Sequence, residues 1–171
     1  MNLNTKTITL LALCTAIICI LGPLSISIGP IPLSLGLLAV FLLAYILEKK
    51  SVICIILYLI IGLIGLPVFS GFSGGAMKLL GLTGGYLLSY PLCAYISALF
   101  IKKFDNYKLH FLGMVLGLIA CYMFGTIYFC FVGNAELAYA LKVCVIPFII
   151  PDLIKIVLAI LIGSQLKKRL K

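Results

Sequence analysis

The chain has 171 residues, of which 64% are hydrophobic and only 10% are charged. A water-soluble domain carries about 25% charged residues, so this chain lacks the polar surface needed to cover a soluble globule. Its net charge of +9 would suggest nucleic-acid binding in a soluble protein, but the basic residues here separate apolar runs, which indicates a protein in a lipid bilayer with no nucleic-acid partner.

Six apolar runs follow one another along the chain, and each predicts a membrane-spanning helix. They cover residues 8–22, 33–47, 51–66, 82–101, 109–133 and 146–166. A spanning helix needs about 20 apolar residues. The second and third runs have only about 15, so flanking loop residues must extend their ends. No remaining segment is long enough for a soluble domain. We expect an all-α fold in which residues 1–171 form a single six-helix membrane domain.

The basic residues predict the orientation of this domain. If the six spans alternate in direction, ten of the 13 lysines and arginines lie on one side. The positive-inside rule places that side in the cytoplasm. Both termini are then cytoplasmic, which requires an even number of spans. We expect a multi-pass protein of the cell membrane.

Two connections on the opposite side are rich in glycine, proline and serine, at residues 22–36 and 65–86. Irregular backbone cannot face lipid, because each unsatisfied N–H or C=O group costs several kcal/mol there. We expect these segments to fold over the end of the bundle or to line a wet cavity, as a lid or pocket on the outer face. Plain flexible loops are the alternative.

Three pairs of small residues at i, i+4 spacing predict close helix–helix contacts. They are Ala12 and Ala16, Ala94 and Ala98, and Gly113 and Gly117. Small side chains let another helix approach closely in lipid. Packing within this bundle is the default interpretation, and docking to another membrane protein is the alternative.

Sequence motifs for catalysis or metal binding are missing. The seven cysteines form no Cys-x-x-Cys pair and are interpreted as small buried residues. The single histidine, His110, lacks the companions that a metal site needs and is expected at a membrane–water boundary. The sequence contains no His-Glu-x-x-His, Gly-x-Ser-x-Gly or P-loop motif. We therefore predict no catalytic residue, no metal and no cofactor, and do not expect an enzyme.

Asp152 and Lys155 are the exception to the uncharged apolar runs, in the stretch IPFIIPDLIK. Their spacing of three puts them on one helix face. If the last helix starts near Pro147, they lie about 8 and 12 Å along it. Ionisable residues at such depth are costly and mark a substrate or ion pathway by default. A structural ion pair that only stabilises the bundle is the alternative.

The motifs together resemble the BioY family, the biotin-specific S components of energy-coupling factor (ECF) vitamin transporters. YLIIGLIGLPVFSGFSGG at 58–75 and LTGGYLLSYPL at 82–92 carry the resemblance, with PIPLSLGLLAV at 30–40 and IPFIIPDLIK at 146–155. The resemblance covers nearly the whole chain, in the same order. It departs from the family pattern at Leu82, Gly36, Tyr128 and Ile150-Pro151.

The resemblance implies a six-helix subunit that captures biotin from outside, with biotin as transported ligand rather than cofactor. It also implies a partner complex, which consists of a transmembrane coupling (T) component and two cytoplasmic ATPase subunits. The helix face with Ala12 and Ala16 would be the surface by which this chain docks to that complex. An S component for another vitamin, or a non-transport helical membrane anchor, remain the alternatives. The residues expected to contact the ligand are Asp152, Lys155, Tyr86, Thr83, Gly84, Gly85, Phe72, Gly74 and Gly75.

Apolar rings of the ligand are expected to pack against Phe69, Phe72, Tyr86 or Tyr90, because ligand pockets are mostly apolar with few polar anchors. Lys78 would attract an anionic ligand or would be a solvated loop lysine.

Overall fold

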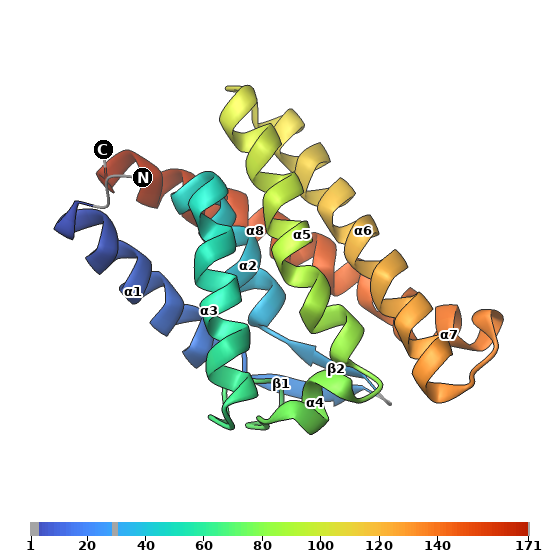
Figure 1. Cartoon of the computed structure of the whole chain (residues 1–171). Helices are drawn as coiled ribbons and strands as arrows, with labels where there is room; N and C mark the ends of the chain where they lie inside the picture. The colour runs from blue at the N-terminus through green and yellow to red at the C-terminus, as the bar shows by residue number, and fades with distance from the viewer. Residues whose placement is uncertain (1–3, 29–30, 171) are drawn as a thin grey trace.

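The computed structural model describes residues 4–28 and 31–170, so Pro30 of the second-span motif and Lys171 of the basic tail lie outside the described residues. Within these ranges the chain is mostly helical, with one short hairpin (Figure 1). The elements are α1 (Thr5–Leu21), β1 (Ser25–Ile28), β2 (Ile31–Ser34), α2 (Gly36–Leu47), a 3-10 turn (Glu48–Lys50), α3 (Ser51–Leu63), α4 (Ala76–Leu80), α5 (Gly84–Lys103), α6 (Tyr107–Gly133), α7 (Leu137–Cys144) and α8 (Ile146–Leu170).

Each predicted apolar run contains one helix, in the order α1, α2, α3, α5, α6 and α8. Within the described part of the chain, α5, α6 and α8 are long and apolar enough to cross a membrane, and α1 is a shorter apolar helix. The helices α2 and α3 have only 12 and 13 residues. The prediction of a mostly helical membrane protein with short second and third runs is confirmed.

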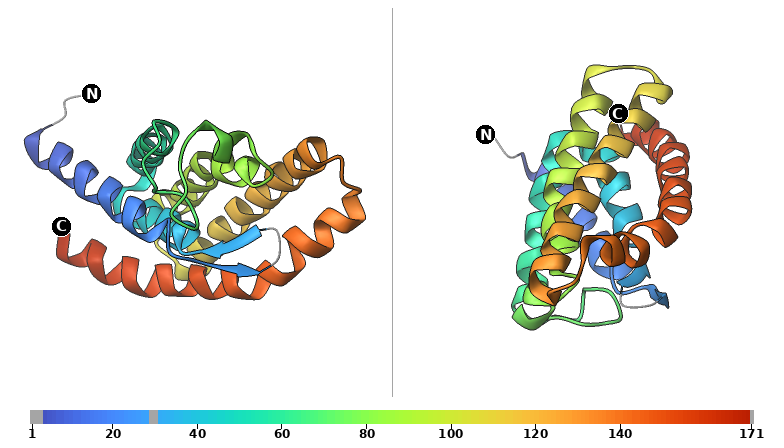
Figure 2. Two further views of the ribbon diagram at one scale, coloured as in Figure 1. Left: turned by 90° about the horizontal axis from the view of Figure 1, so that it is seen from below. Right: turned by 90° about the vertical axis from the view of Figure 1, so that its right-hand side faces the viewer.

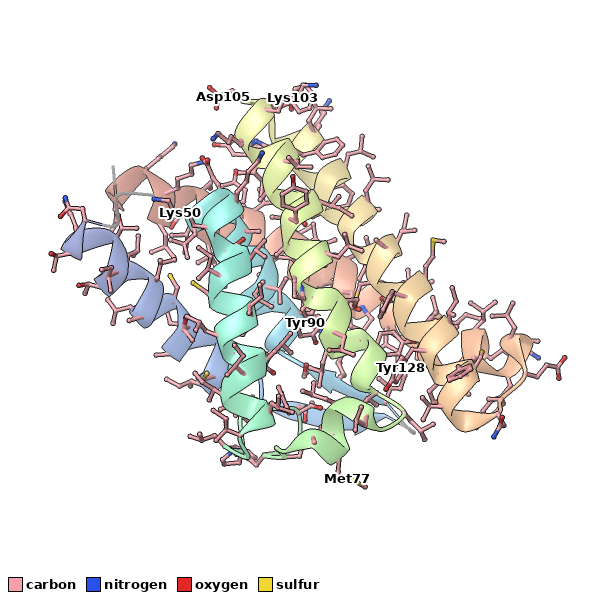
Figure 3. The ribbon with its side chains drawn as sticks, in the orientation of Figure 1. Lys50, Met77, Tyr90, Lys103, Asp105 and Tyr128 are labelled. Atoms are coloured by element: carbon pink, nitrogen blue, oxygen red, sulfur yellow. The ribbon has the colours of Figure 1, made fainter. Side chains whose placement is uncertain are left out.

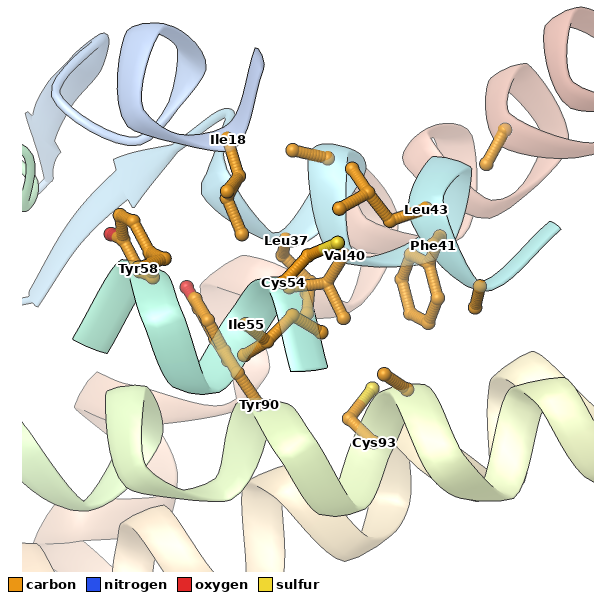
Figure 4. Packing of buried hydrophobic residues seen from close by; sticks show 14 of the residues in the cluster. Ile18, Leu37, Val40, Phe41, Leu43, Cys54, Ile55, Tyr58, Tyr90 and Cys93 are labelled. Carbon is orange, nitrogen blue, oxygen red and sulfur yellow. The ribbon is translucent and has the colours of Figure 1, made fainter. Parts of the chain in front are cut away.

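The shortest of these helices, α2, is the centre of the core. Nine of its 12 residues are buried, as expected of a helix that is hydrophobic on all sides. Figure 4 shows Val40 and Phe41 of α2 close to Cys54 of α3 and Cys93 of α5. Five of the seven cysteines are buried and two, Cys19 and Cys130, are partly buried, and all seven are free thiols.

Two of the three small-residue pairs pack inside the bundle. Ala94 and Ala98 of α5 are fully buried. Side chains added at Gly113 and Gly117 of α6 would overlap α5, the first at the Phe100 ring. The default interpretation is confirmed for both pairs, and the two glycines bring α6 close to α5.

The third pair, unlike the other two, lies on the exposed surface of the bundle. Ala12 and Ala16 are exposed, while α1 buries a different face with Leu11, Cys14 and Ile18. Within residues 4–28 and 31–170, no helix therefore covers the stripe formed by Ala12 and Ala16.

The hairpin corrects the expectation of an all-α fold. Strands β1 and β2 pair antiparallel, with Ser25 opposite Ser34 and Ile28 opposite Ile31. Pairing satisfies the backbone N–H and C=O groups that an irregular segment would leave open at membrane depth. The alternation of serine and isoleucine at residues 25–28 has the two-residue period of a strand.

The long glycine-rich connection after α3 is tied to its surroundings. Phe69 is fully buried over Gly62, with its ring edge-on to Tyr58 at a centroid distance of 5.3 Å. The N–H of Gly71, where φ is +75°, donates to the C=O of Pro23 over 3.0 Å. One backbone hydrogen bond thus joins the two connections that were expected to form a lid.

The start of α1 and the end of α8 lie at the same end of the bundle (Figures 1 and 2). Lys50, Lys103 and Asp105 also lie toward that side, and Met77 lies at the opposite end (Figure 3). Two of the lysines that the sequence assigned to one side of the membrane therefore lie toward the end that holds the start of α1 and the end of α8.

Candidate functional site

A cavity of about 550 Å³, part of it open to the surface, lies next to the hairpin and between α2, α5, α6 and α8. The lining residues are Ile31, Pro32, Leu33, Ser34, Leu37, Ser70, Thr83, Tyr86, Leu87, Tyr90, Cys121, Tyr122, Cys144, Phe148, Asp152 and Lys155. Both predicted lid segments contribute to this wall, as expected.

Asp152 and Lys155 lie together in the wall of this cavity. They are only 3% and 7% exposed, and Nζ of Lys155 donates to Oδ1 of Asp152 over 2.8 Å. Helix α8 begins at Ile146, one residue before the predicted start, so the two side chains project from its first turns. The two side chains do form an ion pair, the arrangement that the structural alternative supposes, and this pair adjoins a cavity.

Tyr122 of α6 holds the other oxygen of the carboxylate. Its hydroxyl donates to Oδ2 of Asp152 over 2.6 Å. Asp152 is therefore bound by a donor from its own helix and by a donor from a neighbouring helix. Hydrogen bonds to a carboxylate are stronger than those between neutral groups, so these two contacts fix the position of Asp152.

Thr83 and Tyr86 also line the cavity, at the start of α5. The Tyr86 hydroxyl lies 3.0 Å from Oγ1 of Thr126 on α6. Thr126 is one helical turn after Tyr122, so both side chains lie on the same face of α6. This face of α6 therefore orients the Tyr86 hydroxyl on α5 and the Asp152 carboxylate on α8.

Five residues that were expected to contact a ligand do not line the cavity: Gly84, Gly85, Phe72, Gly74 and Gly75. Side chains at the first two glycines would overlap Leu79 and Tyr128, and one at Gly74 would overlap the Leu66 carbonyl. Gly75 has a φ of +86°, which suits glycine. These glycines allow close packing and turns in the outer segments.

The predicted aromatic contacts divide in the same way. Tyr86 and Tyr90 line the cavity, whereas Phe72 is 66% exposed and Phe69 is buried in the connection itself. Lys78 lies in α4, away from the cavity lining, and partial burial lowers the pKa of its ammonium group.

Sequence analysis missed several members of the wall, above all Tyr122. A tyrosine in an apolar run is common, so its type alone gave no signal. Its relation to Asp152 spans 30 residues and depends on how α6 crosses α8. The apolar members Leu37, Leu87 and Phe148 were equally hidden among the many apolar residues of their helices.

The arrangement suits a ligand that presents N–H and C=O groups side by side. The Asp152 carboxylate retains lone pairs that can accept from N–H groups. The Lys155 ammonium has three N–H donors, and within the described residues Asp152 is its one hydrogen-bond partner. The remaining wall is mostly apolar, which favours a ligand with a compact hydrocarbon body.

Comparison with known proteins shows the family. The model of the BioY family matches residues 1–171. A probable biotin transporter BioY of Pyrococcus horikoshii is 35% identical over 167 residues, covering 96% of this chain and 98% of the relative. The biotin transporter BioY of Thermotoga maritima is 39% identical over 155 residues, covering 90% and 91% of the two chains.

A solved structure agrees with these relatives. The crystal structure of the S component for biotin from an ECF-type ABC transporter superposes with a TM-score of 0.88 at 34% identity, covering 95% of this chain and 91% of that one. The fold, the order of the motifs and the family match all coincide along the chain. This protein therefore belongs to the BioY family.

Proposed function

We propose that this chain is the biotin-binding S component of an ECF-type ABC transporter and takes part in biotin uptake. The observation that carries the proposal is the buried Asp152–Lys155 pair in the wall of a mostly apolar cavity between the helices. Family membership and the match to a solved S component for biotin support it. The chain is then a transport subunit and not an enzyme.

The chemistry of biotin fits the polar part of the cavity. Its ureido ring carries two N–H donors beside one carbonyl oxygen. Asp152 accepts from a ureido N–H, and Lys155 donates to the ureido carbonyl or pairs with the valerate carboxylate. A ligand without the ureido group leaves these buried charges without a partner, which costs more than losing a neutral hydrogen bond.

The apolar part of biotin fits the rest of the wall. The fused rings pack against Tyr86, Tyr90 and Phe148, and Thr83 adds a hydroxyl at the start of α5. Gly84, Gly85, Gly74, Gly75 and Phe72 act on the ligand indirectly, because they shape the segments that cover the cavity. This assignment narrows the direct contacts to residues that line the cavity.

The wider assembly follows from the same proposal. The six helices α1, α2, α3, α5, α6 and α8 each cross the cell membrane as parts of one domain, with both termini in the cytoplasm. The clustering of Lys50 and Lys103 at the end where the chain starts and finishes supports this orientation. A T component and two ATPase subunits supply the energy, and the exposed Ala12–Ala16 stripe is the docking surface.

Isothermal titration calorimetry of the purified chain with biotin tests the proposal. Asp152→Asn and Lys155→Met should each weaken binding about 30-fold or more, because breaking a buried charge pair costs about 2–5 kcal/mol. Glu48→Gln is the matched control, since it breaks the other ion pair, with Lys167 at 2.9 Å, at the opposite end.

The control should bind biotin as the parent does. Unchanged affinity in both cavity variants would reduce the pair to a structural role. Competition by thiamin or riboflavin at equal concentration would assign the chain to a different vitamin, whereas a chain that binds no vitamin would be a membrane anchor.

A further inference from the structure

A second pocket lies at the basic end of the bundle, away from the biotin cavity. It has about 690 Å³ of space, part of it open to the surface. Its lining comes from α2, from the α5–α6 turn and from the last turns of α8. The lining residues are Tyr45, Ile101, Asp105, Tyr107, His110, Ser164, Lys167 and Lys168.

The inner groups of this pocket are already paired. Nδ1 of His110 lies 2.8 Å from the Tyr45 hydroxyl, and Nε2 lies 2.6 Å from the Phe104 carbonyl oxygen. A carbonyl only accepts, so Nε2 carries a proton and donates to Phe104. Lys167 donates to Glu48 over 2.9 Å. The exposed Lys168 is the lining cation without such a partner among the described residues.

An apolar groove of about 600 Å³ adjoins this pocket, and Tyr107 lines both. The groove lies between α6 and α8. Apart from Tyr107 and Lys108 its lining is apolar: Phe111, Val157, Ile160 and Leu161. Val157 and Leu161 are 47% and 56% exposed, so the groove faces the surroundings of the bundle.

The two spaces form one track along α8. Val157, Leu161, Ser164 and Lys168 follow one another at spacings of three or four, which places them on one face. The track changes from apolar to polar to charged toward the end of the helix. From residue 157 to residue 168 there are 11 steps, which span about 16 Å at 1.5 Å per residue. An acyl chain joined to a charged head has the same order of polarity.

We propose that this track binds an anionic phospholipid of the surrounding bilayer, with its phosphate at Lys168 and Lys167 and one acyl chain in the groove beside Val157. Charge complementarity supports this occupant. The residues 48–50, 102–108 and 167–169 contain eight basic and two acidic side chains, which leaves a net charge of +6. Basic pockets between membrane helices are suited to anionic head groups.

Asp105 is the group that opposes a phosphate. It lines the same pocket and is exposed, so it lowers the positive potential at the rim. A phosphate site predicts opposite effects of neutralising Asp105 and of neutralising Lys168. A groove that simply attracts any lipid tail predicts no effect of either change.

Native mass spectrometry of the purified chain in detergent tests the proposal, with phosphatidylglycerol and phosphatidylcholine of identical acyl chains as probes. We expect phosphatidylglycerol to bind and phosphatidylcholine to be retained at least fivefold less. Lys168→Gln and Lys108→Gln should each weaken phosphatidylglycerol binding about fivefold, and Asp105→Asn should strengthen it, since each charge near an anionic lipid contributes a factor of about this size.

Lys102→Gln is the matched control, because it removes one charge at the same end but lines neither space. It should change binding less than twofold. Val157→Trp fills the groove and should reduce retention of phosphatidylglycerol, while biotin calorimetry reports whether each variant is folded.

Three results would overturn the proposal. Equal effects of Lys102→Gln and Lys168→Gln would indicate diffuse surface attraction. Equal retention of phosphatidylcholine would indicate an apolar groove without a phosphate site. Full competition by inorganic phosphate would indicate a site for free anions rather than for lipid.

Discussion

At the scale of single residues, the carboxylate of Asp152 is fixed before any ligand arrives. Lys155 and Tyr122 hold its two oxygens at 2.8 and 2.6 Å. Burying a charge is costly unless good geometry and further hydrogen bonds compensate for lost water. Two donors from two helices provide that compensation, and they leave less freedom to be lost when a ligand binds.

Tyr122→Phe should weaken biotin binding about tenfold to hundredfold, because the lost hydrogen bond leaves one oxygen of a buried carboxylate with fewer partners, at about 1–3 kcal/mol. Calorimetry on the purified variant measures this change. Tyr139→Phe removes a hydroxyl from an exposed tyrosine of α7 and should bind as the parent does. Full affinity of the Tyr122 variant would show that the phenol only fills space.

Asp152 and Lys155 could be found from the sequence because charge is rare in apolar runs and their spacing shares a helix face. Tyr122 could not, since its partner comes from another helix. Gly84 and Gly85 were expected to contact the ligand, but they do not line the cavity, and the sequence did not show that their close neighbours are parts of this chain. The neighbours are protein atoms of Leu79 and Tyr128.

At the scale of elements, the same spacing of small residues occurs on a packed helix face and on an exposed one. Gly117 of α6 faces α5, whereas Ala12 of α1 faces outward. The spacing predicts a face that another helix can approach, but only the arrangement of helices decides whether that helix belongs to the same chain. The hairpin is a similar case, because its two-residue alternation is only four residues long in β1.

Replacing one small residue of each kind by leucine should separate stability from assembly. Gly117→Leu forces α5 and α6 apart, so the midpoint of thermal unfolding should fall, at a cost of about 1–3 kcal/mol. Ala12→Leu adds a side chain on an exposed face, so unfolding and biotin affinity should stay unchanged while co-purification with the T component falls. Unimpaired co-purification would remove Ala12 from the docking surface.

At the scale of the whole molecule, the helices follow the order of the predicted apolar runs, and Lys50 and Lys103 lie toward the end that holds the start of α1 and the end of α8. The helix order was the most predictable feature, because the bilayer sets the length and apolar character of each span separately. The number of spans and their orientation stay predictions. Cavity shape was the least predictable, since it depends on crossing angles between helices.

Labelling of introduced cysteines tests the orientation. Met77→Cys, at a residue that is 85% exposed, should react with a membrane-impermeant maleimide in intact cells. Lys103→Cys should react only after the membrane is permeabilised. The parent chain corrects for its seven native cysteines, which are buried or half-buried. The reverse pattern of labelling would invert the proposed topology.

The hydrogen bond from Gly71 to Pro23 joins two segments that lie far apart in the chain, and both segments contribute to or adjoin the cavity wall. If either segment moved away from the opening on its own, this hydrogen bond would break. Escape of a bound vitamin would then depend on a joint excursion of both segments, so changes there would alter residence time more than equilibrium occupancy.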